Sequence, residues 1–302
     1  VNLIDTIIEG NESRIGTAGG FWVQNDTETV NISGDSKIIN NAATNNHGGG
    51  FRSDGVVNIT GSATNPIEIT GNIAGGGASG FTDRIGGGFI NTSNGVATLT
   101  DVLIDDNTAY SRGGGFFNGS GAKVYINSSD AATYRSRISN NNLISDDDTA
   151  AGQTWRNYGS GAGFFVESAN SLVDLTDSVI ADNVAIDEGA GFFISSNFAE
   201  VRLTRTDITG NDALDNGGGF YNLANGGIVT MDTVLIDGNV SQTEHGGGFL
   251  NAGILNGSNV TITNNAVGQD LLGASMSTAD LVGGGFYNNA GRLTLTDSVI
   301  DT

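Results

Sequence analysis

A short glycine-rich element followed by phenylalanine recurs throughout the chain and limits the folds open to it. It takes forms such as GGGFIN, RGGGFFN, HGGGFLN and VGGGFYN. Its phenylalanine stands at nine positions: Phe21, Phe51, Phe89, Phe116, Phe164, Phe192, Phe220, Phe249 and Phe286. Because a phosphate-binding loop is needed once, an element repeated this often indicates a structural unit.

Two further residue types recur at fixed places in the same repeat. An asparagine recurs at Asn11, Asn41, Asn72, Asn107, Asn141, Asn183, Asn211, Asn239 and Asn265. An isoleucine lies three residues before each asparagine, at Ile8, Ile38, Ile69, Ile104, Ile138, Ile180, Ile208, Ile236 and Ile262. The segments that lead to the isoleucine, such as VATLTDVLID and RLTLTDSVID, alternate with period two and predict strands.

A coil of parallel strands explains why the same residue must return at the same place. Equivalent positions of stacked coils lie about 4.8 Å apart, so identical side chains contact one another. Isoleucines then fill a core, phenylalanines stack, and buried asparagines hydrogen-bond along the axis. Glycines permit a bend too tight for a Cβ atom. The sequence therefore predicts an all-β parallel β-helix of about ten coils, with about three short strands per coil, as one solenoid over residues 1–302.

The combination of GGGF-x-N with these ladders resembles the right-handed parallel β-helix repeats of bacterial surface proteins. The nearest likeness is to polymorphic outer-membrane proteins and autotransporter passengers, whose repeats carry paired glycines, an apolar residue and a Phe-x-x-Asn element. The likeness covers the whole chain. It implies a right-handed coil and an extracellular or cell-surface location.

The ends and insertions of the repeat suggest how the rod is organised. The chain begins and ends inside a repeat, so we expect a segment of a longer rod or a subunit that pairs end to end with other copies. The distance from asparagine to the next phenylalanine is usually 9 or 10 residues and grows to 17, 23 and 21 in three repeats. These insertions, near 73–85, 142–160 and 266–282, should project from one corner of the coil.

Two sets of residues are candidates for binding. The position after each core phenylalanine should face outwards, which predicts an aromatic stripe for partners or sugars, or a strip covered by the insertions. Its aromatic members are Trp22, Phe117, Phe165, Phe193, Tyr221 and Tyr287. The central insertion carries Trp155 and Tyr158 beside Asp146, Asp147 and Asp148, a combination that can hold calcium or a sugar. The interpretation that we favour for this insertion is a solvated loop that packs its own aromatic residues on the rod.

Charge restricts the partners. The formal net charge is −21 at pH 7, which disfavours nucleic acid and anionic membranes and attracts cations such as calcium. No apolar run is long enough to span a membrane, so we expect no membrane insertion. Cysteine is absent, which excludes disulfides and thiolate metal sites. We expect no cofactor other than calcium.

The sequence favours a non-enzymatic structural or adhesive rod at the cell surface, whose partners are other copies of itself or surface glycans and proteins. The alternatives are a polysaccharide lyase or glycosidase and a carbohydrate-binding module. An enzyme would need carboxylates that converge on one groove. The acids here are spread along columns, and one column alternates in sign through Asp101, Arg135, Asp177 and Arg205. That column is more typical of a surface ion-pair ladder.

Overall fold

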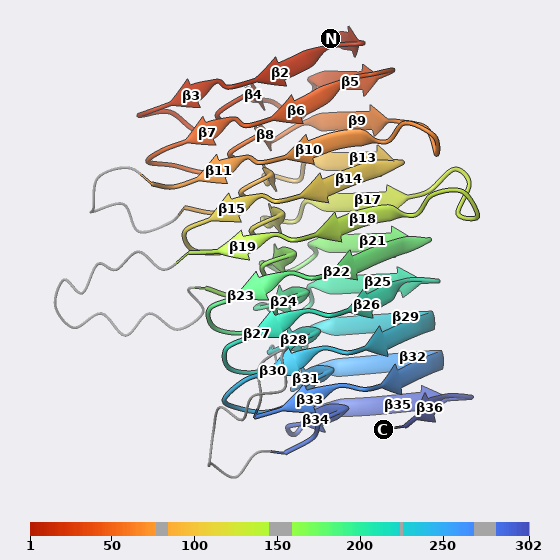
Figure 1. The fold of residues 1–302 in the computed structure, drawn as a ribbon. Helices are drawn as coiled ribbons and strands as arrows, with labels where there is room; N and C mark the ends of the chain where they lie inside the picture. Colours follow the sequence, from red (N-terminus) through yellow and green to blue (C-terminus); the bar gives the residue numbers. More distant parts are fainter. Residues whose placement is uncertain (77–83, 145–158, 224–225, 269–281, 302) are drawn as a thin grey trace, which may run out of the picture.

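The computed structural model describes residues 1–76, 84–144, 159–223, 226–268 and 282–301. In this part of the chain every regular element is a β-strand, and the strands pair in parallel within three sheets. Figure 1 shows these strands as a stack of coils that runs from the N-terminal to the C-terminal end. The predicted all-β parallel β-helix is confirmed, and its right-handed sense stays a prediction. No helix in the described residues is long and apolar enough to cross a membrane.

The largest sheet, here the long sheet, has 18 strands and receives two strand segments from each coil. The first segments are β1 (Asn2–Ile4), β5 (Thr29–Ser33), β9 (Val56–Thr60), β13 (Val96–Thr100), β17 (Lys123–Asn127), β21 (Leu172–Thr176), β25 (Glu200–Thr204) and β35 (Arg292–Thr296). The second segments are β2 (Ile7–Glu9), β6 (Lys37–Ile39), β10 (Ile67–Thr70), β14 (Val102–Asp105), β18 (Ser136–Ser139), β22 (Ser178–Ala181), β26 (Asp207–Thr209) and β36 (Val299–Ile300). Two strands contain both segments, β29 (Ile228–Asp237) and β32 (Ile254–Thr263).

Two nine-stranded sheets complete each coil. The short sheet consists of β3 (Glu12–Ser13), β7 (Ala42–Ala43), β11 (Ile73–Ala74), β15 (Thr108–Ala109), β19 (Asn142–Leu143), β23 (Val184–Ala185), β27 (Asp212–Ala213), β30 (Val240–Ser241) and β33 (Ala266–Val267). The phenylalanine sheet consists of β4 (Phe21–Val23), β8 (Phe51–Ser53), β12 (Phe89–Asn91), β16 (Phe116–Asn118), β20 (Phe164–Val166), β24 (Phe192–Ile194), β28 (Phe220–Asn222), β31 (Phe249–Asn251) and β34 (Phe286–Asn288).

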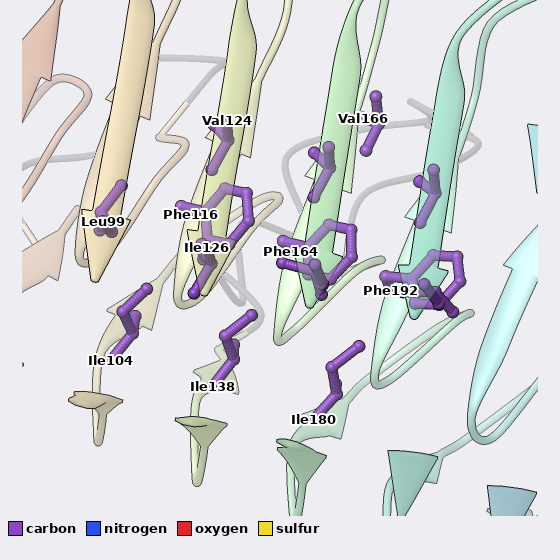
Figure 2. Packing of buried hydrophobic residues seen from close by; sticks show 14 of the residues in the cluster. Leu99, Ile104, Phe116, Val124, Ile126, Ile138, Phe164, Val166, Ile180 and Phe192 are labelled. Atoms are coloured by element: carbon purple, nitrogen blue, oxygen red, sulfur yellow. The ribbon is translucent and has the colours of Figure 1, made fainter. Parts of the chain in front are cut away.

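The strand register places like residues directly above like residues. Ile104 pairs with Ile69 in one neighbouring coil and with Ile138 in the other, and the same pairing extends from Ile8 to Ile300. All these isoleucines between Ile38 and Ile262 are fully buried. Figure 2 shows isoleucine stacked on isoleucine and phenylalanine on phenylalanine in successive coils. The predicted isoleucine column is therefore the core of the rod.

The phenylalanine column forms an uninterrupted stack inside the rod. Neighbouring ring centroids from Phe21 to Phe286 lie 4.6–5.1 Å apart, and their planes differ by 3–7°. The strict coil repeat imposes this parallel geometry, and each pair adds about 0.5–1.5 kcal/mol beyond the area that it buries. The predicted phenylalanine ladder is confirmed.

The asparagine column forms a continuous hydrogen-bonded ladder. Asn141 illustrates one step: its Nδ2 donates to Asn183 Oδ1 at 3.0 Å and to the Ile104 carbonyl oxygen at 3.0 Å. Its Oδ1 accepts from Nδ2 and from the backbone N–H of Asn107. Equivalent side-chain bonds of 2.9–3.1 Å join all nine asparagines from Asn11 to Asn265. The ladder thus satisfies buried backbone groups at a corner where the strands end.

The glycine triplet leaves room for the asparagine ladder. Its first residue has positive φ, as at Gly113 (65°). A Cβ on the third residue of the same triplet, Gly115, would lie 3.1 Å from the Asn141 side chain and 2.4 Å from the Gly163 carbonyl oxygen. The chain therefore needs glycine at the third position because the next coil and the asparagine ladder occupy the space.

Many residues with positive φ lie in two corner columns that bend the chain between strands. One lies directly before the ladder asparagine and contains only Gly, Asn and Asp, at Gly10, Asn40, Gly71, Asp106, Asn140, Asp182, Gly210, Gly238 and Asn264. The other separates the two segments of the long sheet, at Asp5, Asp101, Asp177, Arg205, Thr233, Asn259 and Asp297. Asn and Asp tolerate this conformation best, whereas a β-branched residue such as Thr233 is an outlier.

The ladder makes a central asparagine more important than a terminal one. We predict that Asn141→Ala lowers the free energy of unfolding by about 3–5 kcal/mol, because it leaves several buried groups of Asn107, Asn183 and Ile104 without partners. Urea denaturation of the purified chain measures this change. Asn11→Ala is the matched control, since Asn11 is exposed and should lose about 1 kcal/mol. Equal losses in the two variants would contradict the ladder's buried role.

The strained corner at Thr233 predicts a stabilising substitution. Thr233 is exposed and has φ of 57°, and the next coil places Asn259 at the same corner with φ of 53°. Thr233→Asn should raise the free energy of unfolding by about 1 kcal/mol because asparagine adopts this conformation more readily. The reverse change, Asn259→Thr, should lower it by a similar amount. Thermal unfolding of both variants checks the pair. A loss of stability in Thr233→Asn, or no loss in Asn259→Thr, would show that the corner at Thr233 is unstrained.

Candidate functional site

The aromatic residues that follow the core phenylalanines form a second apolar layer outside the phenylalanine sheet. Phe117, Phe165 and Phe193 are at most 2% exposed, and Tyr221 is 7% exposed. They form a cluster separate from the rod core. These four side chains are therefore buried, not solvent-accessible as the sequence predicts. The alternative, a strip covered by the insertions, stays a prediction.

Arg112, which directly precedes the glycine triplet 113–115, covers two of these rings. The guanidinium of Arg112 lies 5.4 Å from the ring centre of Phe117 and 5.1 Å from that of Phe165. Arg112 also forms an ion pair with Glu167 at 2.9 Å. Because the Arg112 side chain lies against the rings of Phe117 and Phe165, these outward-pointing side chains are covered.

Trp22 and Tyr287 keep more exposure than the other members of the stripe. Trp22 is 43% exposed, donates from Nε1 to Asp54 Oδ2 at 2.8 Å, and has the Arg52 guanidinium 5.1 Å from its ring centre. Arg52 is itself paired with Asp54 at 2.9 Å. Tyr287 is partly buried. The predicted binding role of the stripe stays a prediction for these two residues.

The other predicted binding residues lie outside the described part of the chain. Trp155, Tyr158 and the calcium candidates Asp146, Asp147 and Asp148 are all in this group. Within the residues that the structure describes, no three His, Cys, Asp or Glu side chains come together as a metal-binding group. Calcium binding therefore stays a prediction.

The column of alternating charge forms only part of the predicted ion-pair ladder. Arg205 binds Asp177 with two hydrogen bonds of 2.7 Å. Asp101 is buried and accepts hydrogen bonds from the backbone and the hydroxyl of Ser129. Arg135 reaches past the nearest coil to Asp207. These contacts hold corners and turns together, so the column is structural at the described positions.

The strongest cluster of titratable groups is an acidic corner formed by Asp187, Glu188 and Asp215. Asp187 and Asp215 stand five residues before the core phenylalanine in successive coils, and burial together with the nearby Asp215 carboxyl group raises the pKa of Asp187. Ser160 donates to Asp187 at 3.4 Å and Thr243 donates to Asp215 at 2.8 Å. The two acidic side chains therefore receive hydrogen bonds from the coils on either side of them.

Burial and neighbouring charge raise the pKa values in this corner. Burial, followed by the charge of Asp215, raises the pKa of Asp187 to about 6. Burial, followed by the charge of Asp187, raises the pKa of Glu188 to about 7, although Asn216 donates to Glu188 at 3.2 Å. Burial and the charges of Glu188 and Asp187 also raise the pKa of the Tyr221 phenol. Carboxyl groups tuned in this way can act as general acids near neutral pH.

The sequence carries a signal for this acidic corner, and the signal lies outside the core positions. The segments IDEGAGF, LDNGGGF and TEHGGGF carry an acid five residues before phenylalanine in three successive repeats. Stacked coils bring such residues together because equivalent positions are close in space. Their depth could not be read from the sequence, since it depends on the outer layer that contains Tyr221.

Comparisons of the chain with protein-family models, with curated proteins and with solved structures found no match. The fold and the site are therefore defined by the geometry described above.

The acidic corner predicts that stability falls as pH rises. The native state binds more protons than the unfolded state between the unfolded pKa values, near 4, and the raised native values of about 6 and 7. The free energy of unfolding should therefore decrease with rising pH across this window and level off above it. Thermal unfolding from pH 4 to pH 8 measures the slope.

Two variants assign the slope to this corner. Asp187→Asn and Glu188→Gln should each flatten the pH dependence and raise the melting temperature above pH 7, because each removes a carboxylate from a buried acidic cluster. Asp26→Asn, in an exposed turn, removes one negative charge elsewhere and should leave the slope unchanged. If the pH dependence of stability persists in both corner variants, it arises from the overall charge of the rod and not from this corner.

Proposed function

We propose that this chain is a non-enzymatic structural rod of an extracellular or cell-surface protein, of the kind found in bacterial adhesins. The observation that carries the proposal is the unbroken repetition of three ladders along one axis. Isoleucine, phenylalanine and asparagine contacts are the same in each described coil, so every coil is held by its neighbours through the same interactions. Repeat proteins built in this way gain stability from nearest-neighbour contacts and resist local opening.

The surface and composition support the proposed location. A net charge of −21 keeps a long rod soluble and prevents non-specific self-association. The fold needs no disulfide, so it is independent of the redox state of its surroundings. The partners in this role are other copies of the chain or glycans and proteins of a neighbouring surface. The insertions, which lie largely outside the described residues, remain candidates for such contacts.

The acidic corner favours a second candidate function, hydrolysis or elimination on a polysaccharide. Asp187 and Glu188 have pKa values of about 6 and 7, and residues with strongly shifted pKa values concentrate at catalytic sites. We favour a structural role for these carboxyl groups, because hydrogen bonds from Ser160 and Thr243 join Asp187 and Asp215 to the neighbouring coils.

One experiment separates the two functions. The purified chain is incubated with a panel of neutral and acidic polysaccharides, and new reducing ends and unsaturated products are measured. The structural proposal predicts no product above the buffer control, together with a core that survives proteinase K for hours. Product that disappears in Asp187→Asn, while the exposed control Asp26→Asn remains active, would establish the enzyme instead.

A further inference from the structure

Phe198 combines two unfavourable features at one position. It lies in the turn between β24 and β25 and has φ of 62°, a conformation that is unusual for a bulky side chain. It is also 67% exposed and belongs to none of the three hydrophobic clusters. Neither local conformation nor core packing accounts for a phenylalanine here. Such outliers concentrate where a residue serves binding rather than folding.

The neighbouring coil shows which residue the fold itself would favour. The Phe198 carbonyl oxygen accepts a hydrogen bond from the Asn170 N–H at 3.1 Å, so the two turns are stacked in register. Asn170 has φ of 66°, and asparagine is well suited to that conformation. The phenylalanine therefore replaces a residue type that would relieve strain and interact better with water.

On the side of the Asn170 turn, the surroundings of Phe198 are polar and nearly uncharged. We call this surface the turn edge, and it comprises residues 92–95, 119–122, 167–171 and 195–199, which read TSNG, GSGA, ESANS and SSNFA. Its one charged residue is Glu167, which is paired with Arg112 at 2.9 Å. Backbone hydrogen bonds join the Asn94 turn to Ser120 and the Asn170 turn to Phe198. Ser93, Asn94, Ser120, Asn170 and Asn197 are exposed.

We propose that the turn edge binds a neutral polysaccharide, with Phe198 packed against the apolar face of a sugar ring. Amide and hydroxyl groups of Asn197, Asn170 and Ser168 then bond to sugar hydroxyls. An uncharged ligand is favoured because the rod carries a net charge of −21, which repels anionic chains, and because the edge offers no free carboxylate row to attract cations. Coils rise by about 4.8 Å, so equivalent polar groups repeat along the rod at about the length of one sugar residue.

This inference names a ligand class for the adhesive role proposed above and rests on that role for its biological setting. Its test is independent of that role. The absence of enzymatic activity and the resistance to proteinase K measure the rod, whereas binding at Phe198 is measured on the intact rod.

The decisive variant is Phe198→Asn. It introduces the residue type that the stacked turn already has at Asn170, so the melting temperature should stay the same or rise. Its affinity for the polysaccharide should fall about tenfold, which corresponds to about 1.4 kcal/mol, because the contact between the aromatic ring and the sugar is lost. Phe198→Tyr should retain binding. Ala290→Asn is the matched control, since Ala290 is exposed, has φ of 59°, and lies in the equivalent turn three coils further along the rod, outside the turn edge.

The measurement is retention of the complete chain on insoluble cellulose, chitin, mannan and xylan, followed by calorimetric titration with soluble fragments of whichever is retained. We expect retention on at least one of them, loss in Phe198→Asn and no change in Ala290→Asn. The proposal is overturned if none of the four polymers retains the wild-type chain, or if Phe198→Asn binds as well as wild type. It is also overturned if Phe198→Asn instead converts an oligomer to a monomer in light scattering, which would assign Phe198 to contacts between copies.

Discussion

The asparagine ladder and the glycine that faces it form the constraint on which the rest of the rod depends. At each step an asparagine amide occupies the space beside the third glycine of the triplet, as Asn141 does beside Gly115. The glycine allows the next coil to approach, and the amide satisfies the backbone groups that this approach buries. A larger residue in place of the glycine would displace the amide, and without the amide the buried backbone groups would lack partners. Because every coil must repeat both, the chain is held to one register along its length.

That register determines the core. Once the corner is fixed, Ile104 must lie on Ile138 and Phe116 on Phe164, which gives the parallel ring stack. Asn118, two residues after Phe116, then faces Asn91 in a second ladder, with Asn91 Nδ2 donating to Asn118 Oδ1 at 3.2 Å. This second ladder stops at Val166 and Ile194 and resumes at Asn222. The Oδ1 atoms of Asn91 and Asn222, where the two segments begin, lack hydrogen-bond partners.

The sequence predicted the parts of the fold that depend on repetition. The three inward columns, the parallel sheets and the corner role of the glycines all follow from like residues at like positions. The outer layer could not be predicted from repetition, because the exposure of Phe165 depends on how the Arg112 side chain lies against it. The asparagine of GGGF-x-N marks the second ladder in the sequence, but its pattern is broken at Val166 and Ile194 and so does not predict a ladder. The acidic corner and Phe198 required knowledge of depth and of backbone conformation, which a residue pattern does not contain.

The central claim is that ladder amides are buried and bonded along the whole rod. Hydrogen exchange of asparagine side-chain amides, followed by NMR in the native state, tests it directly. The account predicts that the Nδ2 protons of the fully buried members, Asn41 to Asn239, exchange together and slowly, as groups that open only with the whole rod do. The exposed amides of Asn170 and Asn197 should exchange rapidly. Ladder amides that exchange as fast as these exposed ones would contradict the account.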